Sequence, residues 1–358
     1  MGYSRPPLQS VLMPCGLNTG LPGLLPLLVL LAACRPEPFP PPDPDQLIPP
    51  ASCQAEHPIA LSSIAPDSAL DAPPWHQLCT LCPADSIDFR LVNGEGAEQE
   101  IFQAWAEGGQ CAVAMSQSPL SAAQDWSLQS TLSDGTRSAV WEVELTIAAG
   151  AGAPPLDLGT ATWIAAAERG SLRLPIFPDQ LEEGLLPPAP ELLLSFSPQG
   201  KDGLRRMHLA GLSAGEQDLC IATTELEGVV LDTEGRFSGL IPGGARVPTP
   251  LGDRIERGLL QGQLSADGSQ LLELALIAVL DVAAQAASEQ VSVEEVCALW
   301  EQQLGSDPCV PCVAPDLPDS GPADCVTTVL EWREIPLADV PLQPLTIDQL
   351  SADCPPSL

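Results

Sequence analysis

Basic side chains are scarce in this chain of 358 residues. Lys and Arg together number 14, against 47 Asp and Glu, and the formal net charge is −33 at pH 7. Proteins bind nucleic acids by neutralising phosphates with Lys and Arg, so we expect no nucleic-acid partner. Anionic lipid surfaces should repel the chain for the same reason. A solvated acidic surface is the simplest interpretation, and a specific cationic partner is the alternative.

Histidine is scarcer still, because only His57, His76 and His208 are present. The sequence therefore lacks the zinc-binding helix with two histidines four residues apart, and it lacks the two-histidine, one-carboxylate pattern of non-haem iron sites. It also lacks a phosphate-binding loop, since "GLIPGGARVP" at 239–248 is not followed by Lys and Ser or Thr. These absences predict a protein with no cofactor.

Acidic stretches are the one place where the sequence could hold an ion. "DTEGR" at 232–236 and "DLPDSGPAD" at 316–324 offer carboxylate oxygens, which Ca²⁺ prefers. Neither stretch has the spacing of an EF-hand loop. The sequence therefore predicts no metal site, with a structural Ca²⁺ ion as the alternative.

One pentapeptide fits a catalytic motif. Gly211-Leu212-Ser213-Ala214-Gly215 matches the G-x-S-x-G pattern that places the nucleophile of α/β-hydrolases on a sharp turn between a strand and a helix. In that fold the histidine follows the serine along the chain, whereas all three histidines here precede Ser213. We predict a non-enzymatic protein with no catalytic residue, and a serine hydrolase using Ser213 is kept as an alternative.

No apolar run is long enough to form a membrane-spanning helix. The longest, at 21–33, would reach about 20 Å as a helix, short of the ~30 Å hydrocarbon core. Its length is typical of the apolar region of a signal peptide. The run ends in Leu31-Ala32-Ala33-Cys34, which resembles a bacterial lipobox. This resemblance to bacterial lipoproteins implies that residues 1–33 are removed and that Cys34 carries acyl chains such as palmitate.

The residues after Cys34 indicate a tether. Eight of the fifteen residues from 36 to 50 are proline, a composition typical of an extended, semi-rigid segment. The lipoprotein resemblance implies that residues 34–50 hold a folded body off a membrane of the bacterial cell envelope. The outer membrane is the default location, and the resemblance leaves the leaflet and the protein or small-molecule partner open.

Twelve cysteines are present, one of them within the signal region and one at position 34. An even number of the remainder in an exported chain predicts disulfides, although the pairing cannot be deduced from the sequence. The ten candidates are Cys53, Cys79, Cys82, Cys111, Cys220, Cys297, Cys309, Cys312, Cys325 and Cys354. The alternatives are a four-cysteine zinc site at 297–325 and a redox-active C-x-x-C pair.

Residues 51–260 are predicted to form a β-rich domain. The clearest strand is "SAVWEVELTI" at 138–147, in which apolar and polar residues alternate. Turn signals at 133–136 and 232–235 predict two hairpins. Many short strands separated by Gly and Pro predict an antiparallel sandwich or barrel-like body, whereas residues 51–85 are expected to be irregular.

Residues 261–358 are predicted to form a helical, cysteine-rich region packed on the β domain. Residues 270–287 are expected to form a buried helix, which could line a cavity and make the protein a carrier of an apolar ligand. The capping box Ser292-Val293-Glu294-Glu295 predicts a second helix, with Cys297 facing a strap at 309–325. "VTTVLEWREI" at 326–335 is expected to be a closing strand. The fold class is therefore mainly β, α+β overall, with a two-helix, cysteine-strapped C-terminal part.

Overall fold

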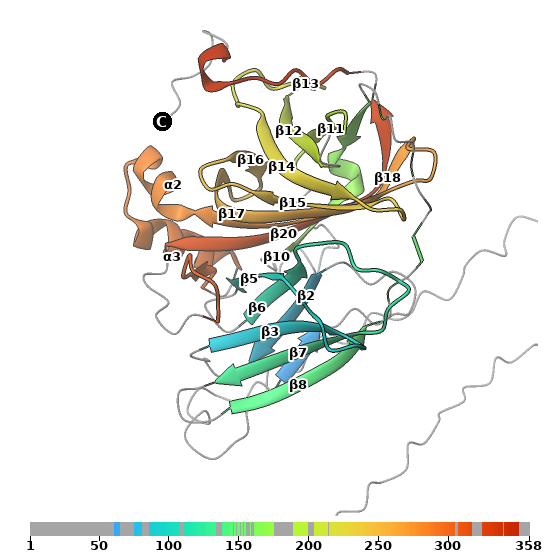
Figure 1. Ribbon diagram of the computed structural model, residues 1–358. Coiled ribbons are helices and arrows are strands. Elements are labelled where there is room, and N and C mark those ends of the chain that lie inside the picture. Colours follow the sequence, from blue (N-terminus) through green and yellow to red (C-terminus); the bar gives the residue numbers. More distant parts are fainter. Residues whose placement is uncertain are drawn as a thin grey trace, which may run out of the picture. The chain divides into compact units, whose positions relative to one another are not determined.

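The structure is a computed structural model, shown in Figure 1. It describes residues 61–64, 75–80, 86–106, 111–133, 138–145, 161–174, 189–199, 204–213, 215–304, 307–316, 324–338 and 340–350, together with positions 147, 149, 150, 152, 154 and 158. The expected signal peptide, the expected lipid attachment site Cys34 and the expected tether lie outside these residues. Cys53, Cys82 and Cys354 also lie outside them.

The fold is mainly β, as predicted, and its centre is a closed antiparallel barrel of eight strands. In chain order these are β9 (Thr162–Ala165), β11 (Leu192–Phe196), β12 (Arg205–Ser213), β14 (Thr224–Leu231), β15 (Arg236–Ile241), β17 (Gly252–Leu264), β18 (Gln270–Asp281) and β20 (Cys325–Ala338). Each strand pairs with the next, and β20 pairs back with β9 through Leu337 and Trp163. The strand predicted at 326–335 is therefore the one that closes the barrel.

Apolar side chains fill the interior of the barrel. Successive residues of a strand point to opposite faces, so Leu274, Leu276 and Ala278 of β18 lie inside. Aromatic rings pack edge to face there: the ring centroids of Trp163 and Phe196 are 5.7 Å apart, and those of Phe196 and Phe237 are 5.0 Å apart. An eight-stranded barrel is just wide enough to be filled in this way.

The prediction of a helix over 270–287 is wrong for most of its length. Residues 270–281 form strand β18, and only Val282–Glu289 are helical, as α2. The cause is burial on both faces. While alternate residues of β18 face the barrel interior, Ala275, Ile277 and Val279 belong to a second apolar cluster outside it. A strand covered on both sides is apolar throughout, so its period of two disappears and it resembles a buried helix.

Eight further strands precede the barrel and form two four-stranded antiparallel sheets. One sheet has the order β1 (Leu61–Ile64), β2 (Trp75–Thr80), β6 (Cys111–Ser116), β5 (Ile101–Ala106). The other has the order β4 (Glu98–Gln99), β3 (Ser86–Asn93), β7 (Trp126–Ser133), β8 (Ser138–Leu145). The hairpin predicted from the turn signal at 133–136 is confirmed as β7–β8. Strands β1 and β2 contradict the expectation of irregular chain at 51–85. Residues 75–80 contain no proline, so they can pair on both sides.

Both sheets share an apolar cluster with the outer face of β17, β18 and β20. Leu259, Ile277 and Val329 of the barrel belong to this cluster. A hydrogen bond also links the N-terminal sheets to the barrel: Nε1 of Trp75 on β2 donates to Oε1 of Glu331 on β20 at 2.7 Å. The boundary expected at 260/261 falls inside β17, so residues on both sides of it build one barrel.

Helices α2 and α3 (Val293–Leu304) lie together at one end of the barrel, beside the ends of β17 and β20 (Figure 1). Helix α3 begins at the predicted capping box, in which the Ser292 amide donates to Oε2 of Glu295 at 2.8 Å and the Glu295 amide donates to Oγ of Ser292 at 3.2 Å. Its residues Trp300 and Leu304 are buried, as predicted. The short elements are β10 (Gly170–Leu174), β13 (Glu216–Gln217), β16 (Arg246–Thr249), β19 (Cys309–Val310) and the 3₁₀ helices η4 (Ala167–Arg169) and η5 (Ile347–Gln349).

Candidate functional site

Disulfides account for all seven cysteines among the described residues. Cys79 bonds to Cys111, Cys297 to Cys309 and Cys312 to Cys325, and Cys220 is disulfide-bonded as well. The predicted link between α3 and the strap at 309–325 is the bond from Cys297 to Cys309. The four cysteines of the possible zinc site are thus joined in two pairs. Neither C-x-x-C motif forms a disulfide between its own two cysteines, because Cys79, Cys309 and Cys312 bond to other cysteines. These bonds rule out both the four-cysteine zinc site and the redox-active C-x-x-C pair.

The stretch 232–236 uses its aspartate for a turn. Oδ1 of Asp232 accepts hydrogen bonds of 2.8 Å from the amides of Glu234 and Arg236 in the β14–β15 hairpin, which turns where it was predicted. Among the described residues, no group of three or more His, Cys, Asp or Glu side chains could hold a metal ion. The stretch 316–324 lies mostly outside those residues.

Ser213 lies on the last residue of β12 and is followed by a hairpin. Its backbone pairs with Glu216 of β13, and Gly215 at the turn has φ +82°. The nucleophile of an α/β-hydrolase requires a strand, a sharp turn and then a helix. Here the chain runs from one strand into the next. Gly215 of the G-x-S-x-G pattern therefore serves a hairpin turn, which requires its positive φ.

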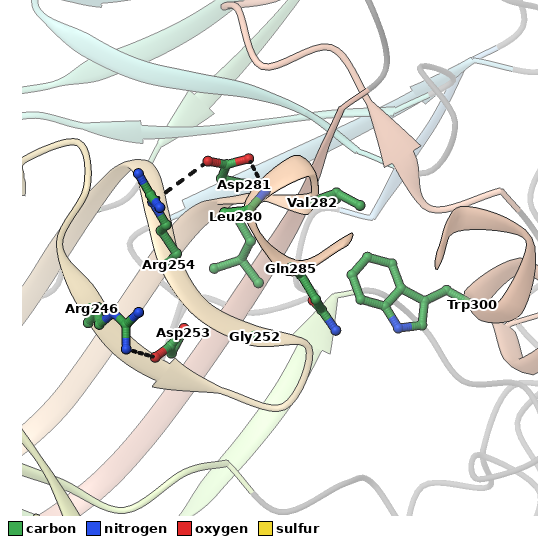
Figure 2. A pocket seen from close by; sticks show the side chains of 10 residues that line it. Arg246, Gly252, Asp253, Arg254, Leu280, Asp281, Val282, Gln285 and Trp300 are labelled. Carbon is green, nitrogen blue, oxygen red and sulfur yellow. Dashed lines mark hydrogen bonds and ion pairs between the residues drawn. The ribbon is translucent and has the colours of Figure 1, made fainter. Parts of the chain in front are cut away.

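A hollow of about 230 Å³ lies at the helical end of the barrel. Figure 2 shows it between the β16–β17 hairpin, the end of β18, the start of α2 and Trp300 of α3. Two arginines and two aspartates line it together with apolar and amide side chains. The lining residues are Arg246, Gly252, Asp253, Arg254, Leu280, Asp281, Val282, Ala284, Gln285 and Trp300.

Asp281 builds the junction at which the hollow forms. It ends β18 and is the N-cap of α2, where its Oδ1 accepts a 2.9 Å hydrogen bond from the amide of Ala284. Its Oδ2 lies 3.7 Å from Nε of Arg254. On the opposite side, Gly252 turns the chain from β16 into β17 at φ +154°, a backbone conformation that favours glycine. The hollow is therefore shaped by a helix cap and a tight hairpin.

The two arginines of the hollow are direct cross-strand neighbours. Arg246 of β16 and Arg254 of β17 occupy opposite positions in the pairing register. Their ion pairs are long: Nη1 of Arg246 lies 3.6 Å from Asp253, and Arg254 lies 3.7 Å from Asp281. Within the described part of the chain, neither guanidinium donates a hydrogen bond. Like charges at opposite positions of a strand pair destabilise it, and the two guanidinium groups keep hydrogen-bond donors that no described residue uses.

Apolar groups complete the lining of the hollow, with Leu280 and Val282 on either side of Asp281 in the chain and Trp300 on α3. Trp300 is only 7% exposed, and Leu280 and Val282 are buried. Figure 2 shows the Trp300 indole on the side away from the two arginines, with Gln285 between them. The hollow thus combines a polar wall with two guanidinium groups and an apolar wall with an aromatic face.

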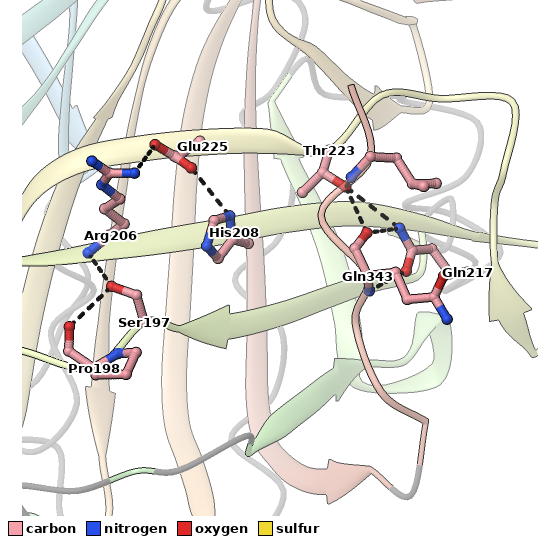
Figure 3. A network of polar contacts seen from close by, with 9 residues as sticks. Ser197, Pro198, Arg206, His208, Gln217, Thr223, Glu225 and Gln343 are labelled. Carbon is pink, nitrogen blue, oxygen red and sulfur yellow. Dashed lines mark hydrogen bonds and ion pairs between the residues drawn. The ribbon is translucent and has the colours of Figure 1, made fainter. Parts of the chain in front are cut away.

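A second polar network lies on the outer wall of the barrel, as Figure 3 shows. Arg206 and His208 of β12 reach Glu225 of β14 at 3.3 Å and 3.7 Å. Burial lowers the pKa of His208, an effect that Glu225 opposes and Arg206 reinforces. Burial therefore favours a neutral imidazole, and the buried Nδ1 of His208 has no hydrogen-bond partner among the described residues.

The same figure shows how the segment 340–350 is fixed to the barrel. The Gln343 amide donates to Oε1 of Gln217, whose Nε2 donates back to the Gln343 carbonyl, both at 2.8 Å. The amide of Thr223 donates to the carbonyl of Leu345 at 2.9 Å, and the amide of Leu345 donates to Oγ1 of Thr223 at the same distance. These bonds fasten the segment beside β13 and β14.

The residues of the hollow were not predicted as a site. The segment singled out at 270–287 does supply Leu280, Asp281, Val282, Ala284 and Gln285, but as a strand end and a helix start. Arg246 and Arg254 carry no signal in the linear sequence, because their pairing appears only once β16 and β17 are aligned.

Comparisons with known proteins leave the fold and the hollow to be read from this chain alone. No protein-family model, no curated protein and no solved structure matches it. Among the described residues, no helix combines the length and the apolar character needed to cross a membrane.

Proposed function

We propose that the chain is a bacterial lipoprotein, anchored through Cys34, whose folded body has a non-enzymatic binding or structural role at the cell envelope. The observation that carries this proposal is the apolar run ending in Leu31-Ala32-Ala33-Cys34, followed at once by a proline-rich stretch. Each buried methylene of an acyl chain contributes about 0.8 kcal/mol, so two or three chains anchor a protein stably.

The disulfides support the proposed compartment. Disulfides persist in oxidising environments such as the bacterial periplasm and the cell surface, and they are rare in the cytosol. Three are defined between described residues, and two of them fix the strap at 309–325. The acidic composition also supports a body that stays off an anionic lipid surface while its anchor is inserted.

The two alternative functions gain no support from the described geometry. A carrier of an apolar ligand needs an apolar cavity, whereas side chains fill the barrel interior and the hollow at its end is lined by four charged residues. A serine hydrolase needs a nucleophile elbow, whereas Ser213 leads into a hairpin.

The intact mass of the protein purified from its native membrane tests the proposal. We expect a chain beginning at Cys34 plus acyl chains, and a gain of about 10 Da on reduction if the ten candidate cysteines form five disulfides. Cys34→Ser should abolish acylation, whereas the matched variant Cys15→Ser should leave it unchanged. An unacylated chain that begins elsewhere would contradict the anchor, and loss of acylation in both variants would point to a disturbed signal.

A further inference from the structure

We propose that the hollow between the β16–β17 hairpin and helices α2 and α3 binds a small monocarboxylate with an aromatic or other compact apolar body. This inference goes beyond the proposed function and does not depend on the lipid anchor. It assigns Arg246 and Arg254 to the carboxylate and Trp300, Leu280 and Val282 to the apolar body.

The pairing of Arg246 with Arg254 is the first observation that indicates an anionic ligand. Side chains at opposite positions of an antiparallel pair have Cβ atoms about 5 Å apart, so the two guanidinium groups repel each other. Two other arginines of the described chain show what a short ion pair looks like: Arg173 lies 2.7 Å from Glu331 and Arg236 lies 2.6 Å from Glu234. An anion between Arg246 and Arg254 would relieve their repulsion and use donors that the protein leaves idle.

The two aspartates carry the second step, because they limit the charge of the occupant. Asp253 and Asp281 bring the formal charge of the hollow to zero, and the chain as a whole carries −33. A dianion such as sulfate would meet strong repulsion from both sources. A single negative charge costs least and still gains the guanidinium donors together with the positive end of the α2 dipole.

The apolar wall carries the third step. A carboxylate alone would gain little over water, since the two guanidinium groups are partly exposed. Burying a ring against Trp300, Leu280 and Val282 supplies the apolar contribution that the charge cannot. The volume of about 230 Å³ lies below the ~300–1,000 Å³ of drug-sized sites, so the occupant is a small molecule.

Benzoate is the probe, titrated into the full chain at pH 7 and followed by the line widths of its ring protons. We expect saturable binding, with protein-free buffer as the blank. Benzamide has the same shape without the charge and should bind at least tenfold more weakly. Sulfate should not displace benzoate at equal concentration.

Single substitutions test whether benzoate binds in this hollow. Arg254→Gln should weaken benzoate binding at least tenfold, because a hydrogen bond to a charged group is lost. The side chain of Arg254 is 53% exposed, so this variant should fold. Arg90→Gln removes the same charge from β3 and should bind as the parent does. Trp300→Phe should weaken benzoate and benzamide alike.

Three results would overturn the inference. They are absence of saturable benzoate binding, equal binding of benzamide and benzoate, and equal affinities in Arg254→Gln and Arg90→Gln. Failure of the lipid anchor would be seen in the mass measurement instead and would leave these affinities unchanged.

Discussion

At the scale of single residues, Glu331 joins three parts of the molecule. This buried carboxylate on β20 accepts hydrogen bonds of 2.7 Å from Nε1 of Trp75 on β2 and from Nε of Arg173 on β10. Its charge is compensated by an arginine that is itself 41% exposed. A carboxylate buried with fixed partners fixes geometry more than it adds stability, because desolvation offsets much of the attraction.

Removing this carboxylate should nevertheless be costly. Glu331→Ala leaves the N–H of Trp75 without its acceptor, and we expect a loss of about 3 kcal/mol in the free energy of unfolding. Glu331→Gln keeps an acceptor and should lose less. Urea unfolding measures both, with Glu334→Gln as the control, since Glu334 is exposed and its ion pair with Arg169 is long. Equal effects at 331 and 334 would contradict this role.

His76 on β2 makes stability depend on pH. Burial lowers its pKa to about 4 from the ordinary 6.5, because the charged imidazolium is poorly solvated there. Above pH 6.5 both folded and unfolded chains hold neutral imidazole, so nothing is lost. As the pH falls from 6.5 towards 4, only the unfolded chain binds the proton, and the fold is destabilised.

The expected loss from His76 is about 2 kcal/mol between pH 7 and pH 5. His76→Gln cannot titrate and should lose correspondingly less over the same interval, because all other groups are shared with the parent. Urea unfolding at the two pH values gives the comparison. Parallel pH dependences of the parent and His76→Gln would show that the imidazole is free to ionise in the folded chain.

At the scale of elements, the described part of the strap, residues 309–316, connects the barrel to the N-terminal sheets. The bond from Cys312 to Cys325 attaches it to β20, and Nε of Arg257 on β17 donates to the Cys312 carbonyl at 3.0 Å. The amide of Ile87 on β3 donates to the carbonyl of Pro315, also at 3.0 Å. The disulfide to β20 thus fixes a segment that also contacts β17 of the barrel and β3 of an N-terminal sheet.

Breaking that disulfide should loosen both contacts. The double variant Cys312→Ser, Cys325→Ser opens a loop of 13 residues, and we expect a loss of about 3 kcal/mol. Hydrogen exchange of the Ile87 amide should accelerate at the same time. The matched variant Cys297→Ser, Cys309→Ser opens a loop of similar size, with a sequence separation of 12, and keeps the bond from Cys312 to Cys325, so it should lower stability without a specific effect on this amide. Unchanged exchange at Ile87 in the first variant would contradict the connection.

Sequence patterns correctly predicted the elements that depend on residues close together in the chain. The hairpin at 232–235, the alternating strand from 138 and the capping box at Ser292 all depend on neighbours within a few residues. The strand at 270–281 depends on what covers it, and its cover comes from residues more than a hundred positions earlier. The hollow was beyond reach for the same reason, since β16, β17, α2 and α3 meet only after the barrel closes.

At the scale of the whole molecule, charge opposes compactness. A net charge of −33 concentrates carboxylates around the folded body, and self-repulsion of like charges destabilises the compact state. Several ion pairs of the described surface involve largely exposed side chains, as between Arg90 and Glu98, and such pairs contribute little. Repulsion therefore outweighs surface attraction.

Salt should consequently stabilise the protein. Raising NaCl from 10 to 150 mM shortens the screening length from about 30 to about 8 Å. We expect the midpoint of thermal unfolding to rise by about 3 °C, equivalent to roughly 1 kcal/mol. Calorimetry in NaCl and in KCl should give the same rise, because screening does not depend on the identity of the cation. A fall in the midpoint would show that surface ion pairs dominate.

The closure of the barrel has a consequence for the order in which the chain can fold. The pair Trp163 and Leu337 is separated by 337 − 163 = 174 positions, so the first barrel strand waits for the last before its outer edge is occupied. Pairing across such a distance is slow, and a strand edge that waits can recruit a strand from another molecule. Whether the chain emerges from the ribosome or from a membrane pore, its first barrel strands are exposed until residue 337 has passed. The arrival of β20 therefore sets the time during which aggregation competes with folding.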